Sequence, residues 1–203
     1  MPKALITGFE PFDGFSVNPS AELAQVVEGT RIGNFEVVGE VLPLDYRKAF
    51  SLLEELIEDY SPNALLCTGQ ANRPAITIER IAVNAISTTR ADNYGYIPET
   101  DLISDQGPPA YFTNIDPHPL VKALKNEDIP AFVSYHAGVY GCNWLIYKVM
   151  EWIGASEMNL MATFIHVPPL PQQAIEKENP QLATMPLGTI AEAIKVIILN
   201  LPK

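Results

Sequence analysis

Along the chain, apolar runs of strand length alternate with segments in which apolar residues recur every three or four positions. The runs predict buried strands, and the recurring pattern predicts helices with one apolar face. We expect strands over 3–9, 35–42, 64–68, 76–83, 131–135 and 160–167, and helices over 19–28, 45–60, 120–126, 142–153 and 186–199. This alternation favours an α/β fold, a single domain over residues 1–203 with a twisted, mostly parallel sheet flanked by helices on both faces.

Ligands of such sheets bind beyond the carboxyl ends of the strands. The segments that follow strands are therefore the first places to look for a site: 9–18, 69–73, 136–142, and His166 onward. The stretch 84–109 is polar and carries Gly and Pro, which predicts a long loop that is either functional or partly disordered.

Composition narrows the classes of partner. The chain has 13 Lys and Arg against 24 Asp and Glu, a net charge of −11. Nucleic acid and anionic membrane surfaces are excluded as expected partners, because both require a basic footprint. The apolar stretch 190–201 is interrupted by Glu192 and Lys195, so no membrane span is expected. Two cysteines make no disulfide framework, and the cytoplasm is the expected compartment.

Cys142 is the first candidate for chemistry. It follows the predicted strand 131–135 through a small-residue turn and opens a predicted helix. Backbone N–H groups at a helix start favour a thiolate and lower the pKa of a cysteine. The alternative is a small buried hydrophobic residue, which is the commoner state of a free cysteine.

A histidine that could serve this thiol as general base is His166, at the end of the strand 160–167. His136, six residues before Cys142, is a second candidate base. His118 lies between two prolines and is interpreted as a loop residue.

Glu79 is the acid of interest. Period-two alternation over 76–83 puts it on the face of Ile81 and Val83, so a carboxylate falls on a largely apolar face. A buried carboxylate needs a partner, which is either the imidazole of a catalytic histidine or a nearby cation. One relay of Cys142, His166 and Glu79 explains all three positions together.

The loop after the first strand offers a pocket wall. Phe9 and Phe12 either enclose a small apolar pocket or pack beneath the loop as core. Asn18 precedes Pro19 as a helix N-cap, and Gln70 follows the third strand, where its amide can face the same pocket. The sequence has no phosphate-binding loop and no metal-ligand spacing, so we expect neither a metal nor a cofactor.

Several of these residues stand in longer motifs that occur in one order. They are Thr7-Gly8-Phe9-Glu10-Pro11-Phe12-Asp13-Gly14 with Asn18-Pro19-Ser20, Gly69-Gln70-Ala71, Ile78-Glu79-Arg80 with Asn84, Gly107-Pro108 with Ala110-Tyr111-Phe112, Ser134-Tyr135 with Ala137-Gly138 and Cys142-Asn143, and Phe164-Ile165-His166-Val167-Pro168 with Leu170-Pro171. In these motifs the chain resembles the pyroglutamyl peptidase type I family of cysteine peptidases over nearly its whole length.

The resemblance implies an exopeptidase that removes N-terminal pyroglutamate through a thiol acyl-enzyme. It implies Cys142 as nucleophile, His166 as general base and acid, and Glu79 as the residue that orients His166. It also implies that Phe9 and Phe12 sandwich the lactam ring and that Asn18 and Gln70 recognise its polar edge. A single α/β domain and a homotetramer are further implications.

The sequence departs from the family pattern at four places: Asn72-Arg73 after Gln70-Ala71, Thr89 followed by Arg90 where the family has its oxyanion arginine at the earlier position, His136, and Gly141. Arg90 is thus a substitute candidate for the oxyanion. Two alternatives stay open at this level: a thiol amidohydrolase of another small acyl or cyclic substrate, and a non-catalytic relative that binds small molecules.

Overall fold

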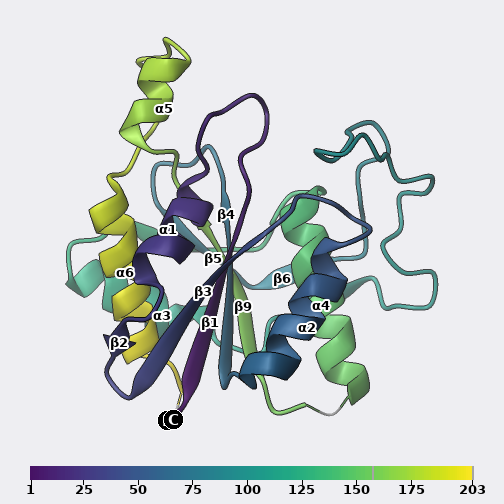
Figure 1. The fold of residues 1–203 in the computed structure, drawn as a ribbon, viewed down its shortest axis with the longest axis horizontal. Helices are drawn as coiled ribbons and strands as arrows, with labels where there is room; N and C mark the ends of the chain where they lie inside the picture. Colours follow the sequence, from purple (N-terminus) through teal and green to yellow (C-terminus); the bar gives the residue numbers. More distant parts are fainter. Residues whose placement is uncertain (157, 203) are drawn as a thin grey trace.

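A seven-stranded mixed sheet forms the centre of the protein in a computed structural model that describes residues 1–156 and 158–202 (Figure 1). Its strand order is β2-β3-β1-β4-β9-β5-β8. These strands are β1 (Lys3–Phe9), β2 (Arg31–Ile32), β3 (Phe35–Leu42), β4 (Ala64–Gln70), β5 (Ile76–Glu79), β8 (Ala131–Ser134) and β9 (Met161–Val167). A small second sheet pairs β6 (Ile81–Val83) with β7 (Ala110–Phe112).

Most neighbouring strands in the main sheet run parallel, which confirms the predicted α/β fold. β3, β1, β4 and β9 run in one direction, while β5 is antiparallel to β9 and β2 is antiparallel to β3. The carboxyl ends of four strands therefore meet at one edge of the sheet. The segments that carry Phe9, Gln70 and His166 all leave the sheet there.

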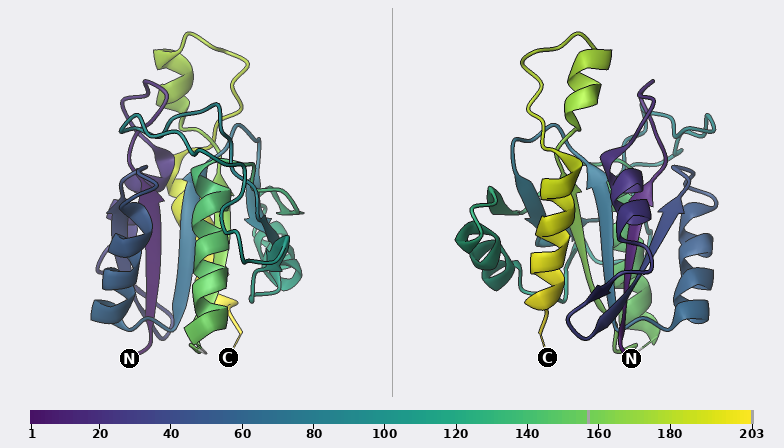
Figure 2. Two further views of the ribbon diagram at one scale, coloured as in Figure 1. Left: turned by 90° about the vertical axis from the view of Figure 1, so that its right-hand side faces the viewer. Right: turned by 60° about the vertical axis from the view of Figure 1, so that its left-hand side comes forward.

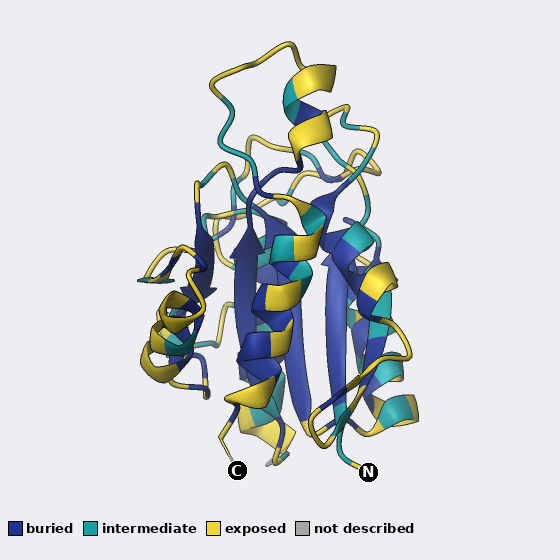
Figure 3. Cartoon of the chain, turned by 90° about the vertical axis from the view of Figure 1, so that its left-hand side faces the viewer, coloured by how far each residue is buried: buried dark blue, intermediate teal, exposed yellow. Residues whose placement is uncertain are grey.

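Helices cover both faces of the sheet (Figures 1 and 2). They are α1 (Pro19–Val27), α2 (Ala49–Tyr60), α3 (Pro117–Asn126), α4 (Gly141–Ser156), α5 (Pro171–Glu176) and α6 (Leu187–Leu199). α1, α3 and α6 share one apolar core with the sheet, and α2 and α4 share the other. Figure 3 shows the periodicity behind this arrangement: α6 turns its buried residues to the strands and its exposed residues to solvent. None of the helices among the described residues is long and apolar enough to cross a membrane.

The structure corrects the interpretation of 76–83 as one strand. The chain leaves the main sheet at Arg80, whose N–H donates to the carbonyl of Ser134, and enters the small sheet as β6. The alternation that put Glu79 on one face with Ile81 and Val83 therefore does not hold. Glu79 is fully buried in the main sheet, whereas the other two side chains are partly exposed in the small one.

Five further elements differ from expectation. The helix expected from residue 45 begins at Ala49, and His118 belongs to the first turn of α3 because Asp116 caps the helix ahead of it. The short elements β2, β7 and α5 were not predicted, since two to six residues carry too little periodicity. Residues 84–109 form neither helix nor strand, as expected for a long loop.

Candidate active site

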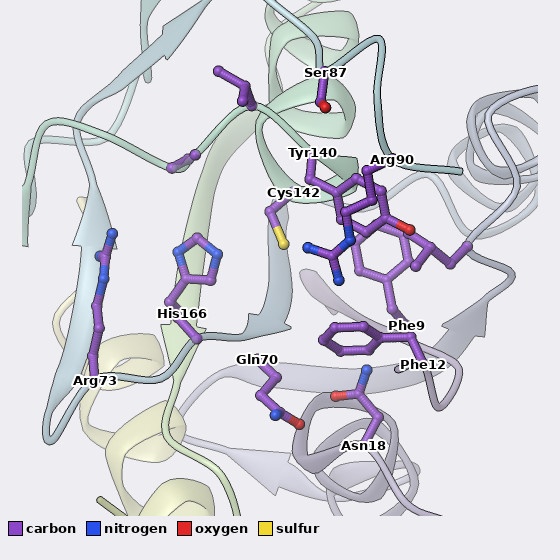
Figure 4. A pocket seen from close by; sticks show the side chains of 15 residues that line it. Phe9, Phe12, Asn18, Gln70, Arg73, Ser87, Arg90, Tyr140, Cys142 and His166 are labelled. Atoms are coloured by element: carbon purple, nitrogen blue, oxygen red, sulfur yellow. The ribbon is translucent and has the colours of Figure 1, made fainter. Parts of the chain in front are cut away.

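A cavity of about 370 Å³ opens at the carboxyl edge of the sheet (Figure 4). All predicted site residues line it except Glu79, which lies behind His166. The lining residues come from the ends of β1, β4 and β9, from the turn before α4, and from the long loop after β6. Segments far apart in the sequence thus meet where the topology predicts a ligand site.

Glu79 and His166 form a buried pair. The imidazole Nδ1 lies 2.7 Å from Glu79 Oε1. Sheet register explains the contact: Thr77 lies opposite His166 in the antiparallel β5–β9 pair and Glu79 lies opposite Phe164, so Glu79 is a diagonal neighbour of His166 on one face. A carboxylate at Nδ1 fixes that nitrogen as the protonated one and leaves Nε2 as the free base.

Glu79 has a second partner that sequence reasoning did not assign. Arg73 Nη1 lies 2.9 Å from Glu79 Oε1 and also donates to Thr77 and Ser134. Arg73 Nη2 donates to the carbonyl of His136. The two uses considered for the carboxylate, orienting an imidazole and pairing with a cation, therefore occur together. In the sequence, Arg73 is marked only by its place in a departure from the family pattern.

These partners decide the charge state of Glu79. Burial alone raises the pKa of this carboxyl, but the hydrogen bond with His166, the imidazolium charge and the charge of Arg73 outweigh it. The net pKa lies below the ordinary value of 4.5. The carboxylate is thus ionised at neutral pH and accepts the Nδ1 proton of His166.

Cys142 is the second residue of α4, and its sulfur faces the imidazole of His166 in the cavity (Figure 4). Gly69, at the end of β4, leaves room for it. A Cβ atom on that glycine would lie 2.8 Å from Cys142 Sγ and 2.9 Å from Phe164 Cζ. With α4 at this distance from β4, any larger residue at position 69 would collide with the sulfur.

The expected depression of the Cys142 pKa is wrong for this structure. Burial is the largest effect on the thiol, and together with the charge of Glu79 it raises the pKa to about 12. Arg90, the backbone N–H at the helix start and Arg73 all act in the lowering direction but are outweighed. The thiol is therefore protonated at neutral pH.

Phe9 and Phe12 differ in their surroundings. Phe9 is buried in the core shared with α2 and α4 and also lines the cavity, so both interpretations of this side chain apply. Phe12 lies on the loop after β1, is partly buried and lines the same cavity. Figure 4 shows both phenylalanines across the cavity from His166, with the Phe12 ring beside Asn18.

Asn18 caps α1 as expected. Its Oδ1 accepts from the N–H and the hydroxyl of Ser20, and its Nδ2 donates to the carbonyl of Glu10. These bonds tie the loop that carries Phe12 to the start of the helix. Asn18 therefore combines the capping role with a place in the cavity wall.

Arg90 reaches the cavity although it stands one position after the family's arginine. Its guanidinium carbon lies 3.9 Å from the centroid of the Tyr140 ring, and it pairs with Asp13. Thr89 is exposed and bonds Ser87 instead. The structure thus brings Arg90, and not Thr89, to the cavity, where its charge acts on the Cys142 thiol.

The remaining departures also have places in the structure. His136 is exposed, accepts a hydrogen bond from Gly138 at Nδ1, and does not line the cavity, so it is not placed as a base for Cys142. Gly141 lies against Leu44, whose Cδ1 occupies the space where a larger residue at 141 would extend. Leu44 thereby completes the wall that a side chain at 141 would otherwise form.

No group of three His, Cys, Asp or Glu side chains that could hold a metal ion is present in the parts of the chain that the structure describes.

Comparison with known proteins gives full-length matches. The family model for pyroglutamyl peptidase matches residues 2–202. A pyrrolidone-carboxylate peptidase of Thermococcus onnurineus (strain NA1) is 42% identical over 197 residues, covering 97% of this chain and 96% of its own. One from Bacillus subtilis (strain 168) is 38% identical over 195 residues, covering 96% and 89%. The solved pyrrolidone carboxyl peptidase of Thermococcus litoralis superposes with a TM-score of 0.93 at 36% identity, covering 98% of this chain and 92% of that one.

Proposed function

Because the chain belongs to the pyroglutamyl peptidase family, we propose that it is a cysteine exopeptidase that hydrolyses the bond after an N-terminal pyroglutamyl residue. The observation that carries this proposal is the cavity in which Cys142 faces His166, with Glu79 2.7 Å behind the imidazole. A thiol, a base and a carboxylate in this order are the parts that acyl transfer requires.

The first step is attack of the Cys142 sulfur on the pyroglutamyl carbonyl carbon. A C–S bond forms as the thiol proton passes to Nε2 of His166, so no free thiolate has to accumulate beforehand. Glu79 stabilises the imidazolium through Nδ1. The backbone N–H of Cys142 at the start of α4 is the proposed donor to the developing oxyanion, an interaction worth about 3 kcal/mol when well aimed. Arg90, which lines the same cavity beside Tyr140, supplies a positive charge.

The second half of the reaction returns the enzyme. The imidazolium gives its proton to the leaving amine as the C–N bond breaks, and a thioester of pyroglutamate remains on Cys142. His166 then takes a proton from a water molecule whose oxygen attacks the thioester. The C–S bond breaks, the thiol is protonated again, and free pyroglutamate leaves.

Recognition follows from the chemistry of the ring. Pyroglutamate is a five-membered lactam without a charged α-amine, so its site needs apolar walls and a few polar groups. Phe9 and Phe12 supply the proposed walls, and Asn18 and Gln70 supply the polar groups at that end. These assignments favour a lactam over the open-chain acyl substrates of other thiol amidohydrolases.

The test is hydrolysis of a fluorogenic pyroglutamyl amide under reducing conditions, with Cys142→Ser and Cys67→Ser compared. We expect Cys142→Ser to lower kcat by at least about a thousandfold, since removing the nucleophile removes covalent catalysis. Cys67→Ser should retain turnover, because Cys67 is buried in the core shared with α2 and α4 and does not line the cavity. Near-normal turnover by folded Cys142→Ser protein would refute the nucleophile assignment.

We further propose a homotetramer in the cytoplasm. The family resemblance supports the tetramer, and a reducing compartment suits an enzyme that depends on a free thiol. Light scattering coupled to size-exclusion chromatography tests the first proposal. A mass of one chain, 22.3 kDa, would contradict it.

A further inference from the structure

Gln173, in the short helix α5, is a fully buried side chain whose hydrogen bonds reach the cavity wall. Its Oε1 accepts from the N–H of Leu170 at 2.8 Å, and its Nε2 donates to the carbonyl of Val17 at 3.2 Å. The same Nε2 donates to Gln70 Oε1 at 2.9 Å. Gln173 thus joins α5, the loop before α1 and the end of β4.

Two backbone groups determine which atom donates and which accepts in each hydrogen bond of Gln173. The N–H of Leu170 can only donate and the carbonyl of Val17 can only accept, so the amide of Gln173 has one allowed orientation. The remaining N–H of Gln173 then donates to Gln70, so the side-chain oxygen of Gln70 must be the acceptor. The Nε2 of Gln70 is left over, and it has no hydrogen-bond acceptor within the described part of the chain.

Asn18, like Gln70, has only a hydrogen-bond donor free toward the cavity, and its own hydrogen bonds are the reason. Its Oδ1 already accepts two hydrogen bonds from Ser20, and one N–H of its Nδ2 is bonded to the Glu10 carbonyl. What Asn18 has left to offer is the second N–H. The side-chain amides of Asn18 and Gln70 therefore each have an N–H free to donate to a ligand, whereas both amide oxygens already accept hydrogen bonds from the protein.

We propose that Gln173 is a positioning residue that holds Gln70 as a hydrogen-bond donor, so that this end of the cavity selects a ligand with a carbonyl acceptor. The inference rests on the proposed function, in which that acceptor is the lactam C=O. An N-terminal proline has a CH₂ group in place of this carbonyl and would leave the donors unpaired, which a buried site strongly penalises. Discrimination between pyroglutamate and proline thus begins at a residue outside the cavity.

The decisive experiment is a double-mutant cycle between Gln70→Ala and Gln173→Met, read as the Kd of 2-pyrrolidone by calorimetry and as KM and kcat for the pyroglutamyl amide. We expect Gln173→Met to raise Kd and KM about tenfold, the loss typical of one neutral hydrogen bond, and to change kcat less. In the Gln70→Ala background the same substitution should have no further effect. Additive effects would overturn the proposal.

A further variant, Gln173→Glu, tests whether the direction of the hydrogen bond or only the packing of the side chain matters. Gln173→Glu keeps the shape and still accepts from Leu170, but it cannot donate, so the Gln70 amide must turn its oxygen to the cavity. We expect it to weaken 2-pyrrolidone binding more than Gln173→Met does. Equal or tighter binding would contradict the proposal.

The matched control is Glu176→Gln in the same helix. Glu176 accepts from the N–H and hydroxyl of Ser16, so its substitution loosens the contact of α5 with the loop without touching Gln70. Its Kd and KM should stay within about twofold of wild type, as for a surface substitution. A loss equal to that of Gln173→Met would overturn the positioning role.

The calorimetric cycle also separates the two hypotheses. Hydrolysis by the wild-type protein with additive variants would remove the role of Gln173 and leave the proposed function. Absence of hydrolysis by folded wild-type protein would remove the proposed function, and the cycle on 2-pyrrolidone would still decide the role of Gln173.

Discussion

The surroundings of Cys142 shift the pKa of its thiol in opposite directions. The helix start and the charge of Arg90 favour the thiolate, whereas burial and the charge of Glu79 favour the thiol and prevail. The resting site therefore holds a neutral thiol that faces the imidazole of His166. This arrangement suits proton transfer during attack, since His166 receives the proton only when the carbonyl is in place.

The raised pKa of Cys142, about 12, predicts slow alkylation by iodoacetamide at neutral pH. Because only the thiolate reacts, the rate should rise about tenfold per pH unit between pH 7 and 10. Mass spectrometry of the labelled peptide measures it, with Cys142→Ser as the control for labelling at Cys67. A rate that levels off below pH 8 would show a thiol of ordinary or lowered pKa.

Among the elements, β4 and α4 approach each other closely in the site. β4 ends in Gly69-Gln70, so the residue beside the sulfur has no side chain and the next one reaches the cavity. The register of β4 with β9 sets Gly69 opposite His166. One glycine thereby sets how near the thiol lies to the strand that carries its base.

Gly69→Ala tests this packing. The added Cβ would lie within 3 Å of both Cys142 Sγ and Phe164 Cζ. Overpacking of this kind costs about 1–3 kcal/mol, and displacement of the sulfur should lower kcat by about a hundredfold.

The matched control is Gly154→Ala, because Gly154 lies in α4 with nothing within 4 Å of the added Cβ. That variant should gain roughly 0.5–1 kcal/mol of helix stability and keep full activity. Thermal unfolding and kcat are the measurements. Full activity in Gly69→Ala protein would refute the packing argument.

For the whole molecule, Glu79 joins parts of the fold that are remote in sequence. Its carboxylate binds His166 of β9 and Arg73 before β5, and Arg73 continues to Ser134 at the end of β8. Three strands on one side of the sheet are thus linked through one ionised group. The same group serves the site and the stability of the fold.

The pKa of Glu79 lies below 4.5 in the folded protein, so the folded state holds this proton less tightly than the unfolded state. Its contribution to stability is therefore complete above about pH 4.5 and is lost as pH falls toward the folded pKa. Glu79→Gln should lower the free energy of unfolding at pH 7 by roughly 3 kcal/mol, and it should flatten the fall in stability below pH 4.5. Denaturant unfolding between pH 3 and 7 measures both.

Glu151→Gln is the control for that series. Burial raises the pKa of Glu151, but hydrogen bonds with Lys148 and Ser104 and the charge of Lys148 together lower it below the ordinary value. The Glu151–Lys148 pair is partly exposed. Its loss should cost less than about 1 kcal/mol because solvent screens such pairs. An equal cost for the two variants would contradict the special place of Glu79.

Local patterns in the sequence specify the α/β fold, most element positions and the motif residues. Buried strands such as Ala64–Gln70 and amphipathic helices such as Leu187–Leu199 carry their periodicity locally. The N-cap at Asn18 is equally local, because an Asn-Pro pair specifies a helix start. Cys142 and His166 could be singled out because each stands next to a predicted element boundary, and Glu79 because it is a carboxylate in a largely apolar predicted strand.

How these residues meet, and what their surroundings do to their pKa values, depends on the packing of the whole fold. Three such features depend on contacts with other segments, and no local pattern encodes them. They are the break between β5 and β6 at Arg80, the ion pair of Arg73 with Glu79, and the hydrogen bond from Gln173 to Gln70. The raised pKa of Cys142 has the same origin. A helix start is visible in the sequence, whereas the burial that overrides its effect is a property of the packed molecule.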